Sequence, residues 1–192
     1  HNRMHRHGVD LSKKENLWST SAAVIRVKED RVEWVQTGDC TIIMIYRDNA
    51  FKVLVEQDDH DHETLAMWKK EAQKGNAGIG KILMGQIKKV RSGMNRDYGV
   101  LNGEKAADLF LNHGNEPLEG VKEILLFTDG LSIPKEKPKK SKCYKNLVHL
   151  YLTLGLKGLK ARIRQMEKED PLCTRYPRFK CHDDIAAIAV NL

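Results

Sequence analysis

Two aspartates adjoin short apolar segments of strand length, and carboxylates in such positions can hold a metal ion. Asp129 follows the run Ile124–Phe127 after one threonine, whereas Asp183 comes shortly before the run Ile185–Val190. Because the end of one strand lies beside the start of an antiparallel neighbour, we expect these two carboxylates to face one another. Two carboxylates at one sheet edge repel each other unless a cation lies between them.

Three more residues complete the candidate site. Gly130 and Asp184 are expected to adjoin the metal, and Asp39, which follows Gly38 at another strand break, is a third candidate ligand. All the candidate ligands are hard oxygen donors, so the preferred ion is Mg²⁺ or Mn²⁺. Such an ion lowers the pKa of a bound water molecule and orients the resulting hydroxide toward an electrophile such as phosphorus.

Strands are predicted in the first third of the chain, where apolar alternation and β-branched residues are separated by turn residues. The predicted strands are residues 22–27, 32–35, 41–46 and 51–55. Short connections require successive strands to run antiparallel, so this segment is predicted to be a β-meander.

Helices are predicted where apolar residues recur with helical spacing. The predicted helices are residues 64–74, 82–90 and 104–113, and a long segment at 147–166 that is interrupted by Gly155 and Gly158. Residues 98–103 are predicted to be a strand end and a turn, and residues 114–120 a loop. The lysine- and proline-rich residues 134–141 are predicted to form an exposed loop.

The segment Gly75–Lys81 satisfies the G-x-x-x-x-G-K spacing of a phosphate-binding loop. However, Ile82 stands where a hydroxyl should hold magnesium, and the preceding segment is predicted to be a helix instead of the required strand. We therefore interpret it as a connection with glycine hinges.

Histidine and cysteine clusters offer alternative metal sites, for which the sequence favours simpler interpretations. The clusters are His1, His5 and His7; Asp58–Glu63; and Cys173, Cys181 and His182. The first is interpreted as a frayed terminus or purification remnant. The second is the acidic start of a helix, and the third matches no zinc motif in its spacing.

The composition is that of a globular protein. The chain has 192 residues, 41% hydrophobic and 31% charged, which predicts one domain over residues 1–192. There is no apolar run of about 20 residues to span a membrane, and no signal peptide is expected. Four scattered cysteines predict free thiols in a reducing cytoplasm. The net charge of +7 favours acidic or phosphorylated partners, whereas nucleic-acid binding would rest on charge alone and is not expected.

These motifs together resemble the metal-dependent protein phosphatase family, PP2C-like, and particularly its bacterial members. The motifs that carry the resemblance are Ser19–Ala23, Gly38-Asp39, Tyr98–Leu101, Leu125–Leu131 with its Thr-Asp-Gly, and Asp183–Val190. The resemblance implies an α+β fold, an αββα sandwich of two antiparallel sheets flanked by helices. It also implies that Asp129 and Asp183 hold the metal centre, that Asp39 holds a further metal more weakly, and that metal-activated water hydrolyses phosphoserine or phosphothreonine in a protein substrate.

The chain departs from the family pattern in ways that affect activity. No Asp-Gly-x-Gly motif precedes Ser19, so the sequence resembles the family domain without its N-terminal strands. Ile133 stands where many members place a carboxylate, and this puts the third metal site in doubt. We therefore expect weak metal binding and little activity from this chain alone. The alternative is a catalytically inactive pseudophosphatase that binds phosphoproteins as a regulatory module.

Overall fold

The computed structural model describes residues 1–192 as two compact units, each built from separate segments of the chain. Unit 1 comprises His1–Val55, Lys88–Phe127 and Ile188–Leu192, and unit 2 comprises Glu56–Ile87 and Thr128–Ala187. Two antiparallel sheets lie in unit 1 and the two longest helices in unit 2, so the predicted α+β class is confirmed. One domain over residues 1–192 stays a prediction.

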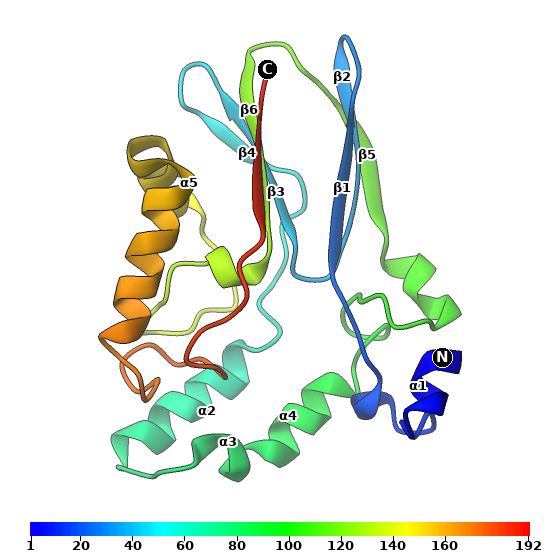
Figure 1. Cartoon of the computed structure of the whole chain (residues 1–192), viewed down its shortest axis with the longest axis vertical. Coiled ribbons are helices and arrows are strands. Elements are labelled where there is room, and N and C mark those ends of the chain that lie inside the picture. The colour runs from blue at the N-terminus through cyan, green and yellow to red at the C-terminus, as the bar shows by residue number, and fades with distance from the viewer. The chain divides into compact units, whose positions relative to one another are not determined.

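Unit 1 contains a three-stranded and a four-stranded sheet (Figure 1). The first has the order β1 (Ala22–Val27), β2 (Arg31–Thr37), β5 (Asn112–Pro117). The second has the order β4 (Phe51–Val53), β3 (Thr41–Tyr46), β6 (Val121–Phe127), β7 (Ala187–Asn191). The predicted antiparallel pairing of the last two strands is confirmed, since the hydrogen bonds Leu192 N to Lys122 O and Thr128 N to Ala186 O, both 3.0 Å, progress in opposite chain directions.

The predicted β-meander is wrong, because β2 and β3 belong to different sheets. Gly38 adopts a positive φ of 67° between these strands, and this allows the chain to leave one sheet and enter the other. Each strand has an apolar face, and stacking the two sheets buries both faces in one core. A short connection therefore requires a reversal of direction but does not require the two strands to pair.

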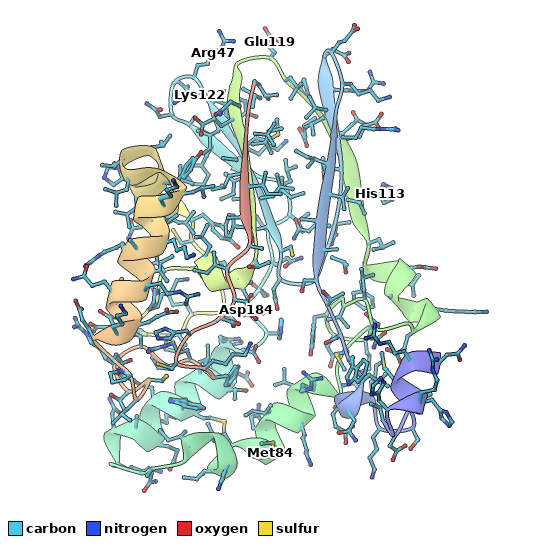
Figure 2. All side chains as sticks on the ribbon, in the orientation of Figure 1. Arg47, Met84, His113, Glu119, Lys122 and Asp184 are labelled. Atoms are coloured by element: carbon cyan, nitrogen blue, oxygen red, sulfur yellow. The ribbon has the colours of Figure 1, made fainter.

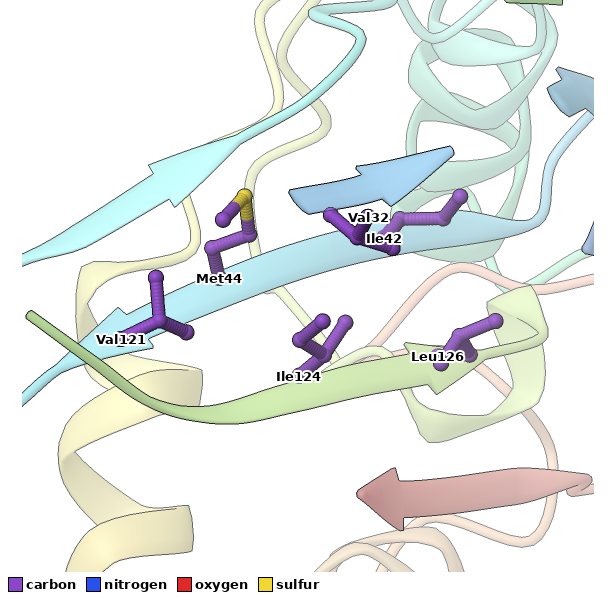
Figure 3. Packing of buried hydrophobic residues seen from close by; sticks show 6 residues of the cluster. All are labelled: Val32, Ile42, Met44, Val121, Ile124 and Leu126. Atoms are coloured by element: carbon purple, nitrogen blue, oxygen red, sulfur yellow. The ribbon is translucent and has the colours of Figure 1, made fainter. Parts of the chain in front are cut away.

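The core of unit 1 lies between the two sheets, as Figure 3 shows in close-up. It is formed by Val32 of β2, Ile42 and Met44 of β3, and Val121, Ile124 and Leu126 of β6. Val121 would face away from Ile124 in a regular strand, since side chains alternate. The β3–β6 register shifts between Ile45 and Tyr46, and the extra residue restores Val121 to the core face.

We expect Ile42→Val to lower the free energy of unfolding by about 1 kcal/mol, because a fully buried methyl group is lost. Urea unfolding followed by circular dichroism measures this change. The control is Val24→Ala on β1, where the side chain is 57% exposed and the expected change is within about 0.5 kcal/mol. Equal effects of the two substitutions would contradict the burial that the structure assigns to Ile42.

Strand β5 was not predicted from the sequence, which indicated a helix at 104–113 followed by a loop. The structure has a 3₁₀ helix, η2 (Lys105–Phe110), and then β5 (Asn112–Pro117). The strand has poor β-propensity, but Gly114 lies opposite Trp34 of β2. A Cβ atom there would lie 3.0 Å from the indole ring, so the glycine leaves room for Trp34. Tertiary packing outweighs local propensity here.

The frayed N-terminus predicted from the sequence is also wrong. Helix α1 (Asn2–Arg6) and the 3₁₀ helix η1 (Lys14–Asn16) form there, and Met4 and Leu17 are buried in a small cluster with Met94 and Val100. Arg91 donates hydrogen bonds to the main-chain oxygens of Glu15 and Leu17, 2.8 and 3.0 Å away. The few apolar residues of this segment are sufficient to order it, because they pack in the same cluster.

Unit 2 is mainly helical and contains α2 (His62–Gln73), α3 (Ile79–Ile82), η3 (Asp129–Leu131) and α5 (Lys145–Lys168). Helix α4 (Met84–Arg91) crosses from unit 2 into unit 1. Trp68 of α2 packs with Ile79, Leu83 and Cys173, and its Nε1 donates to the Cys173 carbonyl at 3.0 Å. Within residues 75–81, predicted to form a glycine-hinged connection, Gly75 and Gly78 adopt positive φ between α2 and α3, whereas residues 79–81 belong to α3.

Helix α5 is kinked at Gly155, which has φ 66° and ψ 178°, so the interruption predicted at this glycine is confirmed. The interruption predicted at Gly158 is wrong, because this residue continues the helix. No helix in the structure has both the length and the apolar character needed to cross a bilayer.

Candidate functional site

Asp129 lies at the first position of η3, directly after the β6–Thr128 segment. The turn is held by hydrogen bonds from Leu131 N to Thr128 O, at 3.0 Å, and from Ser132 N to Asp129 O, at 2.8 Å. The apolar strand before it and the buried Leu131 after it anchor both sides of an exposed carboxylate. The sequence pattern of strand, Thr-Asp-Gly and apolar residue therefore produces a short rigid turn.

The turn of Asp129 lies against the turn of Asp183 and Asp184. Thr128 N donates to Ala186 O at 3.0 Å, and Ala186 N donates to the Thr128 hydroxyl oxygen at 3.1 Å. A Cβ atom on Gly130 would lie only 2.2 Å from the main-chain oxygen of Asp184, so a glycine is required by this close approach. Asp184 itself lies where the chain enters β7 (Figure 2).

Asp183 forms an ion pair with a lysine of its own turn. Lys180 Nζ lies 2.7 Å from Asp183 Oδ1, and the same oxygen accepts a hydrogen bond from Asp184 N at 2.9 Å. The hydrogen bond to Asp183 raises the pKa of the Lys180 ammonium, and, although partial burial lowers it, the charges of Asp183, Asp129 and Asp184 raise it further. A protein-supplied cation therefore lies beside Asp183.

Helix α5 holds the main chain at Asp183. Arg164 donates to the carbonyl oxygen of Asp183 and also pairs with Glu167 at 2.6 Å. Glu167 is buried, with 4% exposure, and its Oε2 atom also lies 2.9 Å from His182 Nδ1. One arginine and one buried glutamate thus connect α5 to the turn that carries Asp183.

The loop before Asp183 is organised by Asp170. Its carboxylate accepts hydrogen bonds from the backbone N–H groups of Thr174, Arg175 and Tyr176, at 2.8 to 3.1 Å, and pairs with Arg178 at 2.9 Å. Burial alone would raise the pKa of Asp170, but these partners outweigh it and lower the pKa from 3.8 to about 2. The carboxylate is therefore charged throughout the neutral range.

Asp39 lies in unit 1, in the turn between β2 and β3. Its backbone N–H donates to the Ser21 hydroxyl oxygen at 2.9 Å. A Cβ atom on Gly38 would lie 2.3 Å from that hydroxyl, so Ser21 packs directly on the turn before Asp39. Its assignment as a third metal ligand stays a prediction.

The candidate donors fit a divalent cation only in their chemistry. The carboxylates of Asp129 and Asp183 are of the type that Mg²⁺ and Mn²⁺ prefer. Their arrangement does not complete a site, because no group of three or more His, Cys, Asp or Glu side chains is placed to hold a metal ion. Lys180 also takes up one oxygen of Asp183. The donor chemistry fits a hard cation, whereas the number of ligands and the neighbouring ammonium do not.

The sequence interpretation did not include Lys180 or Arg164. Lys180 lies three residues before Asp183, a spacing that allows an ion pair only when the intervening chain is turned. Arg164 acts through its side chain from another element. The charge and spacing of Lys180 were a usable signal, but nothing in the local sequence indicates the contact of Arg164.

The fold is similar to solved serine/threonine phosphatases at low sequence identity. A serine-threonine phosphatase 2C from Toxoplasma gondii has a TM-score of 0.51 and 12% identity, with 99% of this chain and 63% of that chain covered. The phosphatase Stp1 from Staphylococcus aureus has a TM-score of 0.45 and 13% identity, with 91% and 56% covered. The catalytic domain of PstP, in complex with two manganese ions, has a TM-score of 0.45 and 14% identity, with 90% and 60% covered.

No family model matches the chain, and no curated protein matches it. The similarity to the phosphatase from Toxoplasma gondii shows the fold of this chain. At 12% identity, it does not show the activity of this chain. The chain spans about three fifths of the length of the structures it matches.

Proposed function

We propose that this chain is a portion of a metal-dependent serine/threonine protein phosphatase whose substrates are phosphorylated proteins. The observation that carries the proposal is the junction of Thr128 with Ala186, which joins the turn of Asp129 to the turn of Asp183. Two hard carboxylate donors at one sheet end, on a fold similar to that of a 2C-type phosphatase, support phosphoester chemistry. The bacterial type and cytoplasmic location expected from the sequence stay predictions.

Asp129 and Asp183 would be this chain's contribution to an Mg²⁺ or Mn²⁺ centre, with Gly130 and Asp184 adjoining it. Asp39 would hold a further metal ion more weakly. A bound ion of this kind supplies charge neutralisation and activation of water. The chain's own residues position the carboxylates. Thr128 and Gly130 hold the two turns together, and Arg164 anchors the main chain of Asp183 to α5.

The activity test is Mn²⁺-dependent hydrolysis of p-nitrophenyl phosphate. We expect the unmodified chain to turn over well below about 1 s⁻¹, because too few ligands converge. We expect Asp129→Ala and Asp183→Ala to reduce this rate at least about tenfold, to background, since each removes a metal-binding carboxylate. The control is Glu119→Ala, an exposed carboxylate between β5 and β6 (Figure 2), which should leave the rate unchanged.

Two outcomes of this assay would contradict parts of the proposal. Full activity that both aspartate substitutions abolish would show that the metal centre is complete in this chain, against the expectation of an incomplete one. A residual rate that neither substitution changes would remove the phosphatase assignment itself.

The second candidate is a pseudophosphatase that binds phosphoproteins without hydrolysing them. The ion pair of Lys180 with Asp183 favours it, because the ammonium already compensates the charge of a predicted ligand. Binding of a phosphorylated protein that persists in EDTA and survives Asp183→Ala would support this candidate. Binding that either treatment abolishes would favour the metal-dependent enzyme.

A further inference from the structure

Lys180 is the feature of this site that the expected chemistry does not use. Its ammonium pairs with Asp183 at 2.7 Å, and Asp129 and Asp184 also interact with it electrostatically. These are the carboxylates expected to bind or adjoin a divalent cation. A positive charge from the protein itself therefore lies where the sequence predicted a metal ion.

The turn that carries Lys180 is fastened on both sides. Arg178 Nε donates to the carbonyl oxygen of Cys181 at 3.1 Å, and Arg164 donates to that of Asp183. Arg178 is itself paired with Asp170. Because these hydrogen bonds hold the backbone on both sides of Lys180, the side-chain torsions of Lys180 alone bring its ammonium to the Asp183 carboxylate.

We propose that Lys180 is an internal counter-ion that lowers the affinity of the Asp129 and Asp183 carboxylates for a divalent cation. The inference rests on the proposed function for the identity of those carboxylates. An incoming cation must either displace the ammonium from Asp183 or bind beside a like charge, and both are unfavourable.

The exposure of the pair limits the size of this effect. The side chains of Lys180 and Asp183 are 63% and 37% exposed, so water and salt screen their interaction. Exposed ion pairs are weak, and the ammonium can be displaced at a sufficient metal concentration. Lys180 therefore sets the concentration at which the metal binds and does not block the site.

The test is isothermal titration calorimetry of the full chain with MnCl₂ alone. We expect Lys180→Met to bind Mn²⁺ about threefold more tightly than the unmodified chain, which corresponds to about 0.7 kcal/mol, within the range for an exposed ion pair. Lys180→Arg keeps the positive charge and should bind as the unmodified chain does. Lys160→Met, at an exposed lysine of α5, is the matched control and should also leave the affinity unchanged.

A double substitution tests whether the gain in Mn²⁺ affinity depends on the Asp183 carboxylate. Lys180→Met with Asp183→Asn should lose the increased affinity, because the carboxylate that the ammonium compensates is then absent. Circular dichroism of each variant confirms that it is folded. The proposal is overturned if folded Lys180→Met binds Mn²⁺ no more tightly than the unmodified chain, or if the gain survives Asp183→Asn.

Calorimetry and the hydrolysis assay distinguish a failure of the Lys180 proposal from a failure of the phosphatase assignment. The expected gain in Mn²⁺ affinity without hydrolysis of p-nitrophenyl phosphate would sustain the role of Lys180 and remove the phosphatase assignment. Manganese-dependent hydrolysis without a change in affinity on Lys180→Met would do the opposite.

Discussion

Replacing Asp170 with alanine is expected to lower the free energy of unfolding by about 3 to 5 kcal/mol, the range for breaking a buried ion pair. The Asp170 carboxylate is buried and pairs with Arg178, whose side chain is 15% exposed. It also accepts the backbone N–H groups of Thr174, Arg175 and Tyr176. Alanine would leave a largely buried guanidinium, 15% exposed, and three N–H groups without this partner.

Stability should depend on pH through the same residue. Burial raises the pKa of Asp170, but hydrogen bonds from Tyr176, Arg175, Thr174 and Arg178 outweigh it and lower the pKa to about 2 in the folded protein. The ordinary pKa of an aspartate in an unfolded chain is about 3.9. The folded state therefore binds the proton more weakly. The stabilisation is fully present above about pH 4 and is lost as the pH falls through about 2.

Urea unfolding between pH 5 and pH 2 measures both effects. Asp170→Asn should be less stable than the unmodified chain at pH 5, and the difference should shrink toward pH 2. Glu169→Ala, at the exposed neighbouring carboxylate, is the control and should change stability by less than about 0.5 kcal/mol. A constant difference between Asp170→Asn and the unmodified chain across this range would contradict the lowered pKa.

Much of the fold was predictable where local pattern and tertiary role agree. The segments at 22–27, 41–46 and 124–127 are rich in β-branched or apolar residues and form strands. The pairing of β6 with β7 followed from the reversed order of carboxylate and apolar run in Asp129 and Asp183. Helix α5 was predictable from its apolar spacing, including the interruption at Gly155.

The remaining features depend on contacts between distant segments. Strand β5 forms from residues of low β-propensity because Gly114 accommodates Trp34. The change of sheet between β2 and β3 depends on burying two apolar faces together, which a three-residue connection does not reveal. Lys180 reaches Asp183 because Asp170 and Arg178 fold the preceding loop, and this network spans several turns.

The other large effect is expected for Gly130→Ala, which should lower the free energy of unfolding by about 3 kcal/mol through overpacking. The added Cβ atom would lie 2.2 Å from the main-chain oxygen of Asp184 and 2.9 Å from its carbonyl carbon. Neither atom belongs to a flexible side chain, so the two backbone turns must separate. Separation moves Asp129 away from Asp183 and strains the hydrogen bonds between Thr128 and Ala186.

Amide hydrogen exchange distinguishes this displacement from a general loss of stability. In Gly130→Ala, the N–H groups of Thr128 and Ala186 should exchange faster, relative to the amides of α5, than in the unmodified chain, because their mutual hydrogen bonds open locally. Gly85→Ala is the control. Nothing lies within 4 Å of its added Cβ atom, and alanine in helix α4 should be neutral or stabilising by up to about 1 kcal/mol. Unchanged exchange at Thr128 and Ala186 would mean that the two turns are not in contact, and the basis for joining Asp129 and Asp183 in one site would be lost.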